Sequence, residues 1–228
     1  MNKKAPIVIA LAVAAGVGAA FLTDPPPKAR QKAYVGFPAA IDPQCRDGKA
    51  RMFDECTDQS VLFEQALSRA AADNKVLLVE LGAEWCIWCH VFEAHINGEY
   101  DKFRYTYGRP EDPEARYTTS FEEGPQWSDA QAAGELRDFV AENFVVVHID
   151  LQYAPNGMDV LSDTGAVEHY KGGVPFVFTV DRQGQAAGVF NHDTVERRRE
   201  DANWYRGYDR RGLISQLTAM RDAARART

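Results

Sequence analysis

Residues 76–90 read VLLVELGAEWCIWCH, and this stretch decides how the chain is expected to fold. Its first part, 76–81, is a short apolar run rich in β-forming residues, which is typical of a strand buried on both faces. Two cysteines, Cys86 and Cys89, follow this run with two residues between them. We therefore expect a buried strand that leads directly into a pair of close cysteines.

The cysteine pair is compatible with three chemistries. Cys-x-x-Cys is a redox dithiol, the same pair followed by His90 is a covalent haem attachment site, and two close cysteines can form half of a zinc site. Small c-type cytochromes are mostly helical, whereas this motif follows a buried strand. A closed zinc site typically uses two close pairs, and Cys45 and Cys56 are too far apart in sequence for that, although a site using His90 or His95 stays open. We favour the redox dithiol and predict no cofactor and no metal ligand.

A helix that begins at Cys86 would favour this redox chemistry. The unpaired N–H groups and the positive end of the helix dipole would stabilise the Cys86 thiolate, which is the attacking species. Cys89 would lie one helical turn away, close enough to resolve a mixed disulfide. We therefore expect Cys86 to be the exposed attacking thiol and Cys89 the more buried resolving thiol.

Elsewhere the hydrophobic pattern alternates between helical and strand spacing. Helices are expected at 60–73, at 90–95, from 135 onward and around 213–220. Strands are expected at 76–81, 144–150, 174–180 and 185–190, the last two joined by a turn at 181–184. Strands that alternate with helices and end in a hairpin indicate an α/β sandwich with a mixed sheet.

Residues 98–134 interrupt this pattern. They contain seven aromatic residues among many charged ones, together with Pro110, Pro113 and Pro125. A run this long without clear periodicity is unusual inside a compact domain, and such loops tend to be functional or flexible. We expect an insertion after the helix at 90–95 that follows the two cysteines.

Two separate marks resemble the thioredoxin family. Residues 79–89, VELGAEWCIWC, look like the family's strand, tryptophan and Cys-x-x-Cys, and residues 173–175, GVP, are followed by an apolar strand and an Asp-x-x-Gly turn. The resemblance covers roughly 59–223, with the insertion unmatched, and the WCIWCH motif resembles a branch that includes exported proteins. It implies a thioredoxin fold, with a central mixed sheet of about four to five strands flanked by helices.

The resemblance also implies roles for residues around the dithiol. Pro175 would form a cis peptide bond opposite the cysteines, and the backbone beside Val174 would hold an extended partner segment by β-type hydrogen bonds. Trp85 would shield the dithiol, unless it serves only in packing, and Trp88 lies between the cysteines, where it would contact substrate.

Two charged or titratable residues near the motif each allow two interpretations. Glu80 occupies the position of the family's buried acid and would accept a proton from Cys89, with a raised pKa; the alternative is a carboxylate at the strand end that reaches solvent. His90 could stabilise a thiolate when protonated, but we expect a surface residue.

The N-terminal part of the chain resembles an export signal. Lys3 and Lys4 precede an uncharged apolar stretch, 5–22, which indicates a signal peptide or an uncleaved membrane anchor over 1–23. A tether with the Cys45 and Cys56 segment would follow over 24–58, and the thioredoxin-like domain would span 59–225. Because disulfides persist outside the cytoplasm, we expect a structural disulfide between Cys45 and Cys56, with a second redox pair as the alternative.

These features lead to two hypotheses about function. The first is an exported, periplasmic thiol–disulfide oxidoreductase that acts on protein disulfides, as a reductase rather than an oxidase, with electrons from a membrane carrier. The second is a non-catalytic binding or assembly module, such as a chaperone or metal-handling factor, in which the cysteines and the insertion hold a partner or copper. The formal net charge of −7 argues against a nucleic-acid binder.

Overall fold

The computed structural model of the protein describes residues 33–109, 112–123, 127–198 and 205–227. The described residues group into one compact unit. The predicted signal peptide or anchor, 1–23, lies outside the described residues. Within the described part of the chain, no helix is both long enough and apolar enough to span a membrane.

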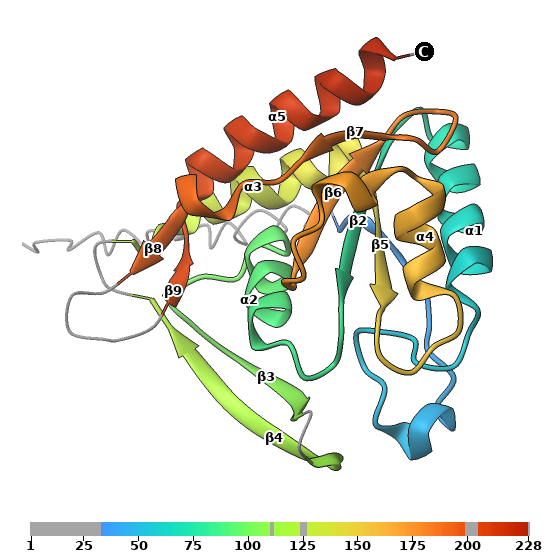
Figure 1. The fold of residues 1–228 in the computed structure, drawn as a ribbon. Helices are drawn as coiled ribbons and strands as arrows, with labels where there is room; N and C mark the ends of the chain where they lie inside the picture. Colours follow the sequence, from blue (N-terminus) through green and yellow to red (C-terminus); the bar gives the residue numbers. More distant parts are fainter. Residues whose placement is uncertain (1–32, 110–111, 124–126, 199–204, 228) are drawn as a thin grey trace, which may run out of the picture. The chain divides into compact units, whose positions relative to one another are not determined.

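A five-stranded mixed sheet forms the centre of this unit (Figure 1). Its strands are β1 (Val35–Phe37), β2 (Val76–Gly82), β5 (Phe144–Asp150), β6 (Phe176–Val180) and β7 (Ala186–Val189). They lie in the order β1-β5-β2-β6-β7, with β1, β5 and β2 parallel to one another and β6 and β7 antiparallel to their neighbours. This is the thioredoxin fold, so the predicted fold class is confirmed.

Helices cover both faces of the sheet (Figure 1). They are α1 (Gln59–Ala72), α2 (Ile87–Ile96), α3 (Ala130–Asn143), α4 (Gly157–Asp163) and α5 (Arg210–Ala226). Helices α2, α3 and α5 pack on the face that carries Leu78 and Val146, whereas α1 and α4 pack on the face that carries Leu77 and Val145. Because side chains alternate along a strand, the even-numbered residues of β2 and β5 point toward α2.

The insertion is more regular than the sequence analysis predicted. Strands β3 (Lys102–Arg109) and β4 (Asp112–Glu122) pair as an antiparallel two-stranded sheet, and α3 begins at Ala130, inside the range assigned to the insertion (Figure 1). Aromatic and polar residues alternate along 102–107, which is the period-2 signal of a strand. The neighbouring prolines and charges obscured that signal.

Polar contacts join the hairpin to the rest of the unit near both of its ends. Just after β4, the buried carboxylate of Glu123 pairs with the buried guanidinium of Arg210 at the start of α5, through contacts of 2.7 and 3.1 Å. Nearer the other end of the hairpin, Arg116 Nε donates a hydrogen bond of 2.9 Å to the Lys49 carbonyl oxygen. The insertion is therefore anchored at two separate points.

The described part of the predicted tether belongs to the domain. Strand β1 pairs with β5 along the sheet edge, and Phe53 is fully buried. The domain therefore begins before 59, and the structure differs from the predicted boundary because a strand of three residues is too short to show periodicity. The remaining short elements are η1 (Cys45–Gly48), η2 (Ala166–His169), η3 (His192–Thr194), β8 (Glu196–Arg198) and β9 (Tyr205–Tyr208).

Candidate active site

The two cysteines of the motif form a disulfide where β2 leads into α2. The Cys86 N–H donates to the Ala83 carbonyl oxygen at 2.9 Å, which turns the chain into the helix. Cys86 is the N-cap of α2, and its Sγ accepts a hydrogen bond of 3.1 Å from the Cys89 N–H. The sulfur thus lies against the N–H groups that a helix leaves unpaired at its start, as the sequence analysis predicted.

The dithiol is more deeply buried than predicted. Cys86 is 2% exposed and Cys89 is fully buried. Phe53 packs against both cysteines, with Met52, Trp85, Trp88 and Val174 around them. The expectation of an exposed Cys86 is therefore wrong, because the segment around Phe53, which was assigned to the tether, packs in the same buried cluster as the two cysteines.

Glu84, directly before the Trp-Cys dipeptide, holds that segment in place. Its buried Oε1 accepts backbone N–H bonds from Arg51 at 2.6 Å, from Met52 and from Phe53 at 2.9 Å. Three N–H donors on one carboxylate oxygen resemble an anion-binding turn, in which the anion is a side chain of the same protein. This role of Glu84 was not predicted from the sequence. The signal that could have revealed it is the presence of a charged residue in the otherwise apolar turn before the cysteines.

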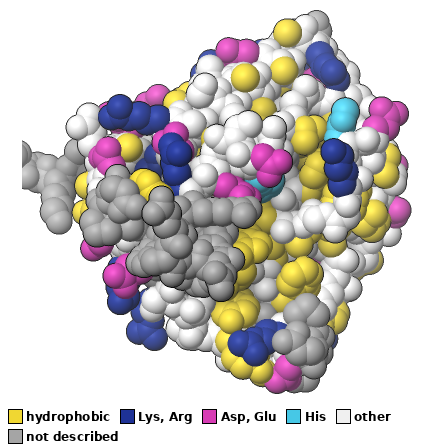
Figure 2. Space-filling view, turned by 60° about the vertical axis from the view of Figure 1, so that its left-hand side comes forward, with side chains coloured by type: hydrophobic (Ala, Val, Ile, Leu, Met, Phe, Trp, Pro, Cys, Tyr) yellow, Lys and Arg dark blue, Asp and Glu magenta, His cyan; other side chains and the backbone are white. Residues whose placement is uncertain are grey.

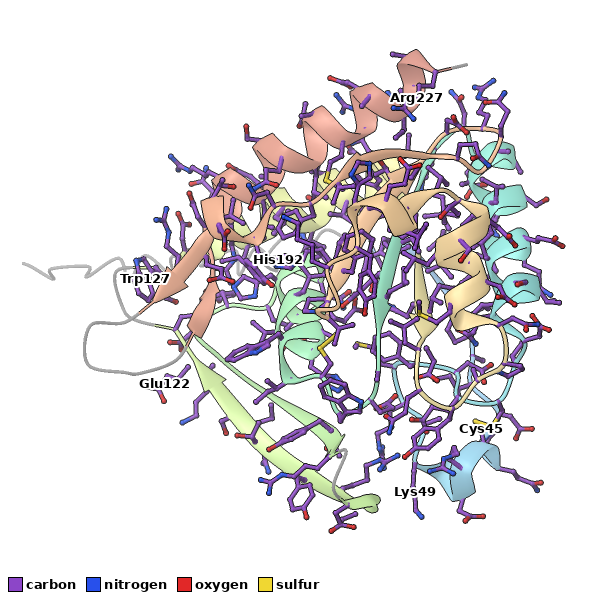
Figure 3. The ribbon with its side chains drawn as sticks, viewed as in Figure 1. Cys45, Lys49, Glu122, Trp127, His192 and Arg227 are labelled. Atoms are coloured by element: carbon purple, nitrogen blue, oxygen red, sulfur yellow. A yellow bond between two sulfur atoms is a disulfide. The ribbon has the colours of Figure 1, made fainter. Side chains whose placement is uncertain are left out.

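Residues expected beside the dithiol are brought to it. Val174 packs against the cysteine pair, and the Val174–Pro175 peptide bond is cis, as the resemblance implies. A cavity of about 840 Å³ adjoins this point, lined among others by Trp88, Val174, Pro175 and His192. Figure 3 labels His192 on the chain between β7 and β8, and Figure 2 shows a band of hydrophobic side chains on one face of the molecule.

Glu80 is a buried acid, as the first interpretation predicted. It is fully buried, so its carboxylate does not reach solvent, and burial together with the nearby Glu93 carboxylate raises its pKa well above the usual range. Within the described residues, neither of its oxygens has a hydrogen-bond partner. Its part in proton transfer to or from Cys89 stays a prediction.

His148 and Glu93 lie next to Glu80. His148 Nε2 is 3.1 Å from Glu93 Oε2 and 3.8 Å from Glu80 Oε2. Burial lowers the pKa of His148 to about 4, so its imidazole is neutral at neutral pH. No metal ligand was predicted from the sequence, yet these three residues form a group that could hold a metal ion.

His90 is buried rather than on the surface. It is 7% exposed, and its Nε2 lies 2.9 Å from the Glu84 carbonyl oxygen, which can only accept a hydrogen bond. Burial lowers its pKa. The expectation of a surface histidine is wrong because the residue after Cys89 faces the turn of the chain that precedes the helix.

Cys45 and Cys56 form the second disulfide, and Figure 3 labels Cys45, the first residue of η1. Between Cys45 and the helix α1, the buried carboxylate of Glu55 lies 3.5 Å from Arg46 Nε and 3.8 Å from Arg116 Nη2. Burial, reinforced by the carboxylates of Asp150 and Glu84, raises the pKa of Glu55 to about 7. The second disulfide and its surroundings thus adjoin the segment that packs against the dithiol.

The chain is similar to known proteins at the level of structure. No family model matches the chain, and no curated protein matches it. Among solved structures, a disulphide isomerase from Xylella fastidiosa Temecula1 is similar at 17% identity and a TM-score of 0.37, over 58% of this chain and 73% of that chain. Function is therefore inferred from the residues of the site.

Proposed function

We propose that the protein is a thiol–disulfide oxidoreductase that acts on protein disulfides through Cys86 and Cys89. The observation that carries this proposal is the position of the disulfide at the start of α2, with Cys86 Sγ on the Cys89 N–H. A thiolate at that place gains a hydrogen bond and the favourable field of the helix N-terminus, so the pKa of Cys86 in the reduced form should lie below the usual value of about 8.5.

The reaction is an exchange of disulfide bonds that transfers two electrons. The Cys86 thiolate attacks one sulfur of the substrate disulfide, forms a mixed disulfide and releases the other substrate sulfur as a thiolate. Cys89 loses its proton and attacks Cys86 Sγ, which releases the second substrate thiolate. The products are a reduced substrate dithiol and the Cys86–Cys89 disulfide. Glu80, on the face of β2 that α2 covers, is the predicted acceptor of the Cys89 proton.

We propose that substrates bind as extended segments beside Val174 and Pro175, with Trp85 and Trp88 as contacts. The cavity next to Trp88 supports this placement, since it runs along the residues that flank the cis peptide bond. Because both sulfurs are buried, a substrate has to displace part of the side-chain cover before it reaches Cys86. Such a cover favours a narrow range of substrates over general disulfide reduction.

We also propose that the protein works outside the cytoplasm, in the periplasm or anchored to the membrane that bounds it. Support comes from the apolar stretch 5–22 behind Lys3 and Lys4, and from the second disulfide, since disulfides persist in oxidising compartments. A dithiol that reduces substrates in such a compartment needs electrons from a membrane carrier. This requirement makes a membrane protein the expected electron donor.

A binding or assembly module is the second candidate. The burial of both sulfurs favours it, because a dithiol that is never reached by a partner disulfide cannot exchange with it. The hairpin of β3 and β4 would then supply the surface that holds the partner. The two candidates differ in whether the Cys86–Cys89 pair cycles between oxidised and reduced forms.

The deciding experiment is the reduction potential of the Cys86–Cys89 pair. The protein is equilibrated with glutathione buffers, its free thiols are alkylated, and the modified cysteines are located by mass spectrometry. We expect a potential of about −250 mV or lower, as for reductases; a value near about −120 mV would identify an oxidase instead. A pair that does not cycle would overturn the enzyme and favour the binding module.

Two variants make the result specific. In Cys89→Ser the resolving thiol is absent, so Cys86 should accumulate a mixed disulfide with a disulfide-containing peptide. The matched control is the double variant Cys45→Ser, Cys56→Ser, which removes the other disulfide and should still turn over. Mixed disulfides at equal levels in Cys86→Ser and Cys89→Ser would contradict the assignment of Cys86 as the attacking thiol.

A further inference from the structure

Three side chains from separate elements converge on the α2 face of the sheet. Glu80 of β2 and His148 of β5 are direct neighbours across the paired strands, and Glu93 comes from α2, which packs on the same face. One ligand atom of each, a carboxylate oxygen or an imidazole nitrogen, lies within 4.8 Å of the other two. Ligand atoms around a tetrahedral ion with bonds of about 2.0–2.2 Å lie about 3.3–3.6 Å apart, so the observed 3.1 and 3.8 Å are close to what a shared ion requires.

We propose that Glu80, Glu93 and His148 bind a divalent transition-metal ion of the zinc class. This site shares Glu80 with the disulfide chemistry proposed for Cys86 and Cys89, but it uses neither cysteine as a ligand, and the proposal does not depend on that function.

The state of Glu80 is the first argument for a ligand. Its carboxylate is fully buried, and no described residue donates a hydrogen bond to either oxygen. A buried carboxylate without a partner is costly, and buried charges in proteins are paired or coordinate metals. His148 Nε2 is nearer to Glu93 than to Glu80, so a single imidazole proton would leave Glu80 unpaired. A cation at the point where the three side chains meet would pair both carboxylates at once.

The surroundings of Glu93 are the second argument. Its Oε1 accepts hydrogen bonds from the Tyr34 hydroxyl and from Asn97 Nδ2, the latter at 2.8 Å. These two donors fix the carboxylate and leave Oε2 directed at His148. Carboxylates that ligate metals are typically held in this way by outer hydrogen bonds. One oxygen of Glu93 thus accepts the outer hydrogen bonds, and the other, Oε2, faces His148 and can ligate the ion.

A cavity provides access to the site. It has a volume of about 470 Å³, and its lining includes Tyr34, Glu93 and His148 together with Arg104, Thr106 and Thr118 of the hairpin. Three protein ligands leave a coordination position open for water or a small ligand from this cavity. The insertion that the sequence analysis could not assign therefore forms a wall of the approach to the proposed ion.

The ligand set indicates the class of metal. One imidazole with two carboxylates is a nitrogen and oxygen site without thiolate, which suits Zn²⁺ and other first-row ions such as Mn²⁺ and Fe²⁺ rather than Cu⁺. The imidazole argues against a pure Mg²⁺ or Ca²⁺ site, since these ions take oxygen ligands. Zn²⁺ and its spectroscopic substitute Co²⁺ are therefore the appropriate probes.

The test measures metal binding and needs no enzyme assay. The protein with both disulfides oxidised is titrated with Zn²⁺ by calorimetry and with Co²⁺ by visible absorption. We expect one ion per chain, and Co²⁺ bands without the intense charge-transfer absorption of a thiolate ligand. The variant Cys86→Ser, Cys89→Ser should bind equally well, which separates this site from the dithiol.

Variants assign the ion to the three residues. Glu93→Gln and His148→Gln should each weaken binding at least tenfold, and Tyr34→Phe should weaken it by about tenfold through loss of the outer hydrogen bond. The matched control is His169→Gln, which removes an exposed imidazole and should leave binding unchanged. Circular dichroism checks that each variant is folded; if His148→Gln unfolds, Glu93→Gln decides, because its side chain is 20% exposed at the cavity wall.

Two results would overturn the proposal. One is the absence of stoichiometric Zn²⁺ or Co²⁺ binding to the oxidised protein at concentrations up to about 1 mM. The other is binding that persists unchanged in folded Glu93→Gln. Both results come from metal binding to the oxidised protein, whereas the proposed function is tested by the reduction potential of Cys86 and Cys89, so the failure of one can be told from the failure of the other.

Discussion

Glu84 Oε1 accepts a hydrogen bond of 2.9 Å from the Phe53 N–H, and Phe53 lies in one buried cluster with Cys86 and Cys89. The residue that precedes the Trp-Cys dipeptide thus fixes the side chain that covers the dithiol. This relationship couples the segment before α1 to the redox motif. Access to Cys86 therefore depends on residues more than thirty positions away in the sequence.

The first prediction concerns Glu84→Ala. The substitution leaves three backbone N–H groups without their acceptor, so we expect the free energy of unfolding to fall by about 3 kcal/mol. Glu84→Gln should cost about half as much, because an amide oxygen can still accept these bonds but without charge. Urea unfolding with both disulfides intact measures the difference.

The same variant should expose the dithiol. Once the Phe53 segment is released, reduced Cys86 should react faster with an alkylating reagent than in the wild type. Glu64→Ala, which removes an exposed carboxylate on α1, is the control and should change neither quantity. Unchanged alkylation in a destabilised Glu84→Ala protein would show that Glu84 supports the fold without controlling access.

Much of the fold could be predicted from the sequence because its strongest signals are local. The apolar runs at 76–81 and 144–150 and the helical spacing at 60–73 lie close to β2, β5 and α1. The short edge strand β1 and the burial of Phe53 could not be predicted, since three residues show no period and the partner contacts are distant in sequence. At the site, the position of Cys86 at the start of a helix was predicted. The packing of Phe53 over the cysteines and the convergence of Glu93 and His148 could not be predicted, because both depend on contacts between residues far apart in the sequence.

The second prediction concerns Gly82, which ends β2 beneath the dithiol. A Cβ at this position would lie 2.5 Å from Phe53 Cζ and 2.6 Å from Cys89 Sγ, both closer than atoms in real structures approach. We expect Gly82→Ala to lower the free energy of unfolding by about 1–3 kcal/mol, because the surrounding side chains have to move. Gly173→Ala is the matched control, since a Cβ there meets nothing within 4 Å. Equal urea midpoints for the two variants would contradict this packing.

The third prediction is a pH dependence of stability that arises at Glu55. Its pKa is raised to about 7 in the folded protein, above the ordinary value of 4.5, so its neutral form is the one that the fold favours. Its contribution to stability is therefore fully present below about pH 4.5 and is lost as the pH rises through about 7. Relative to Glu55→Gln, the free energy of unfolding of the wild type should fall by about 1–2 kcal/mol between pH 5 and 8. This is less than the whole pKa shift would give, because water and the nearby Arg46 and Arg116 screen the charge of the carboxylate.

The comparison with Glu55→Gln isolates this group from the other buried carboxyl groups. Urea unfolding is measured for both proteins at several pH values, and the quantity of interest is the difference between them. If the free energy of unfolding of the wild type falls relative to that of Glu55→Gln between pH 5 and pH 8, the raised pKa of Glu55 is supported. A constant difference would mean that Glu55 titrates in the folded protein as it does in the unfolded chain.

The last prediction concerns the disulfide between Cys45 and Cys56, which closes a short loop directly before α1. If its role is structural, the double variant Cys45→Ser, Cys56→Ser should lose about 2–3 kcal/mol of stability, because the unfolded chain regains the freedom that the cross-link removes. The reduction potential of Cys86 and Cys89 should stay the same.

If the Cys45–Cys56 pair instead relays electrons, mild reductant should open its disulfide as readily as the active-site disulfide. The loss of the pair should then slow re-reduction of Cys86 and Cys89. Mass mapping of alkylated cysteines across glutathione buffers distinguishes the two, and we expect the Cys45–Cys56 bond to open only under the more reducing conditions, since stable structural disulfides resist the glutathione pool.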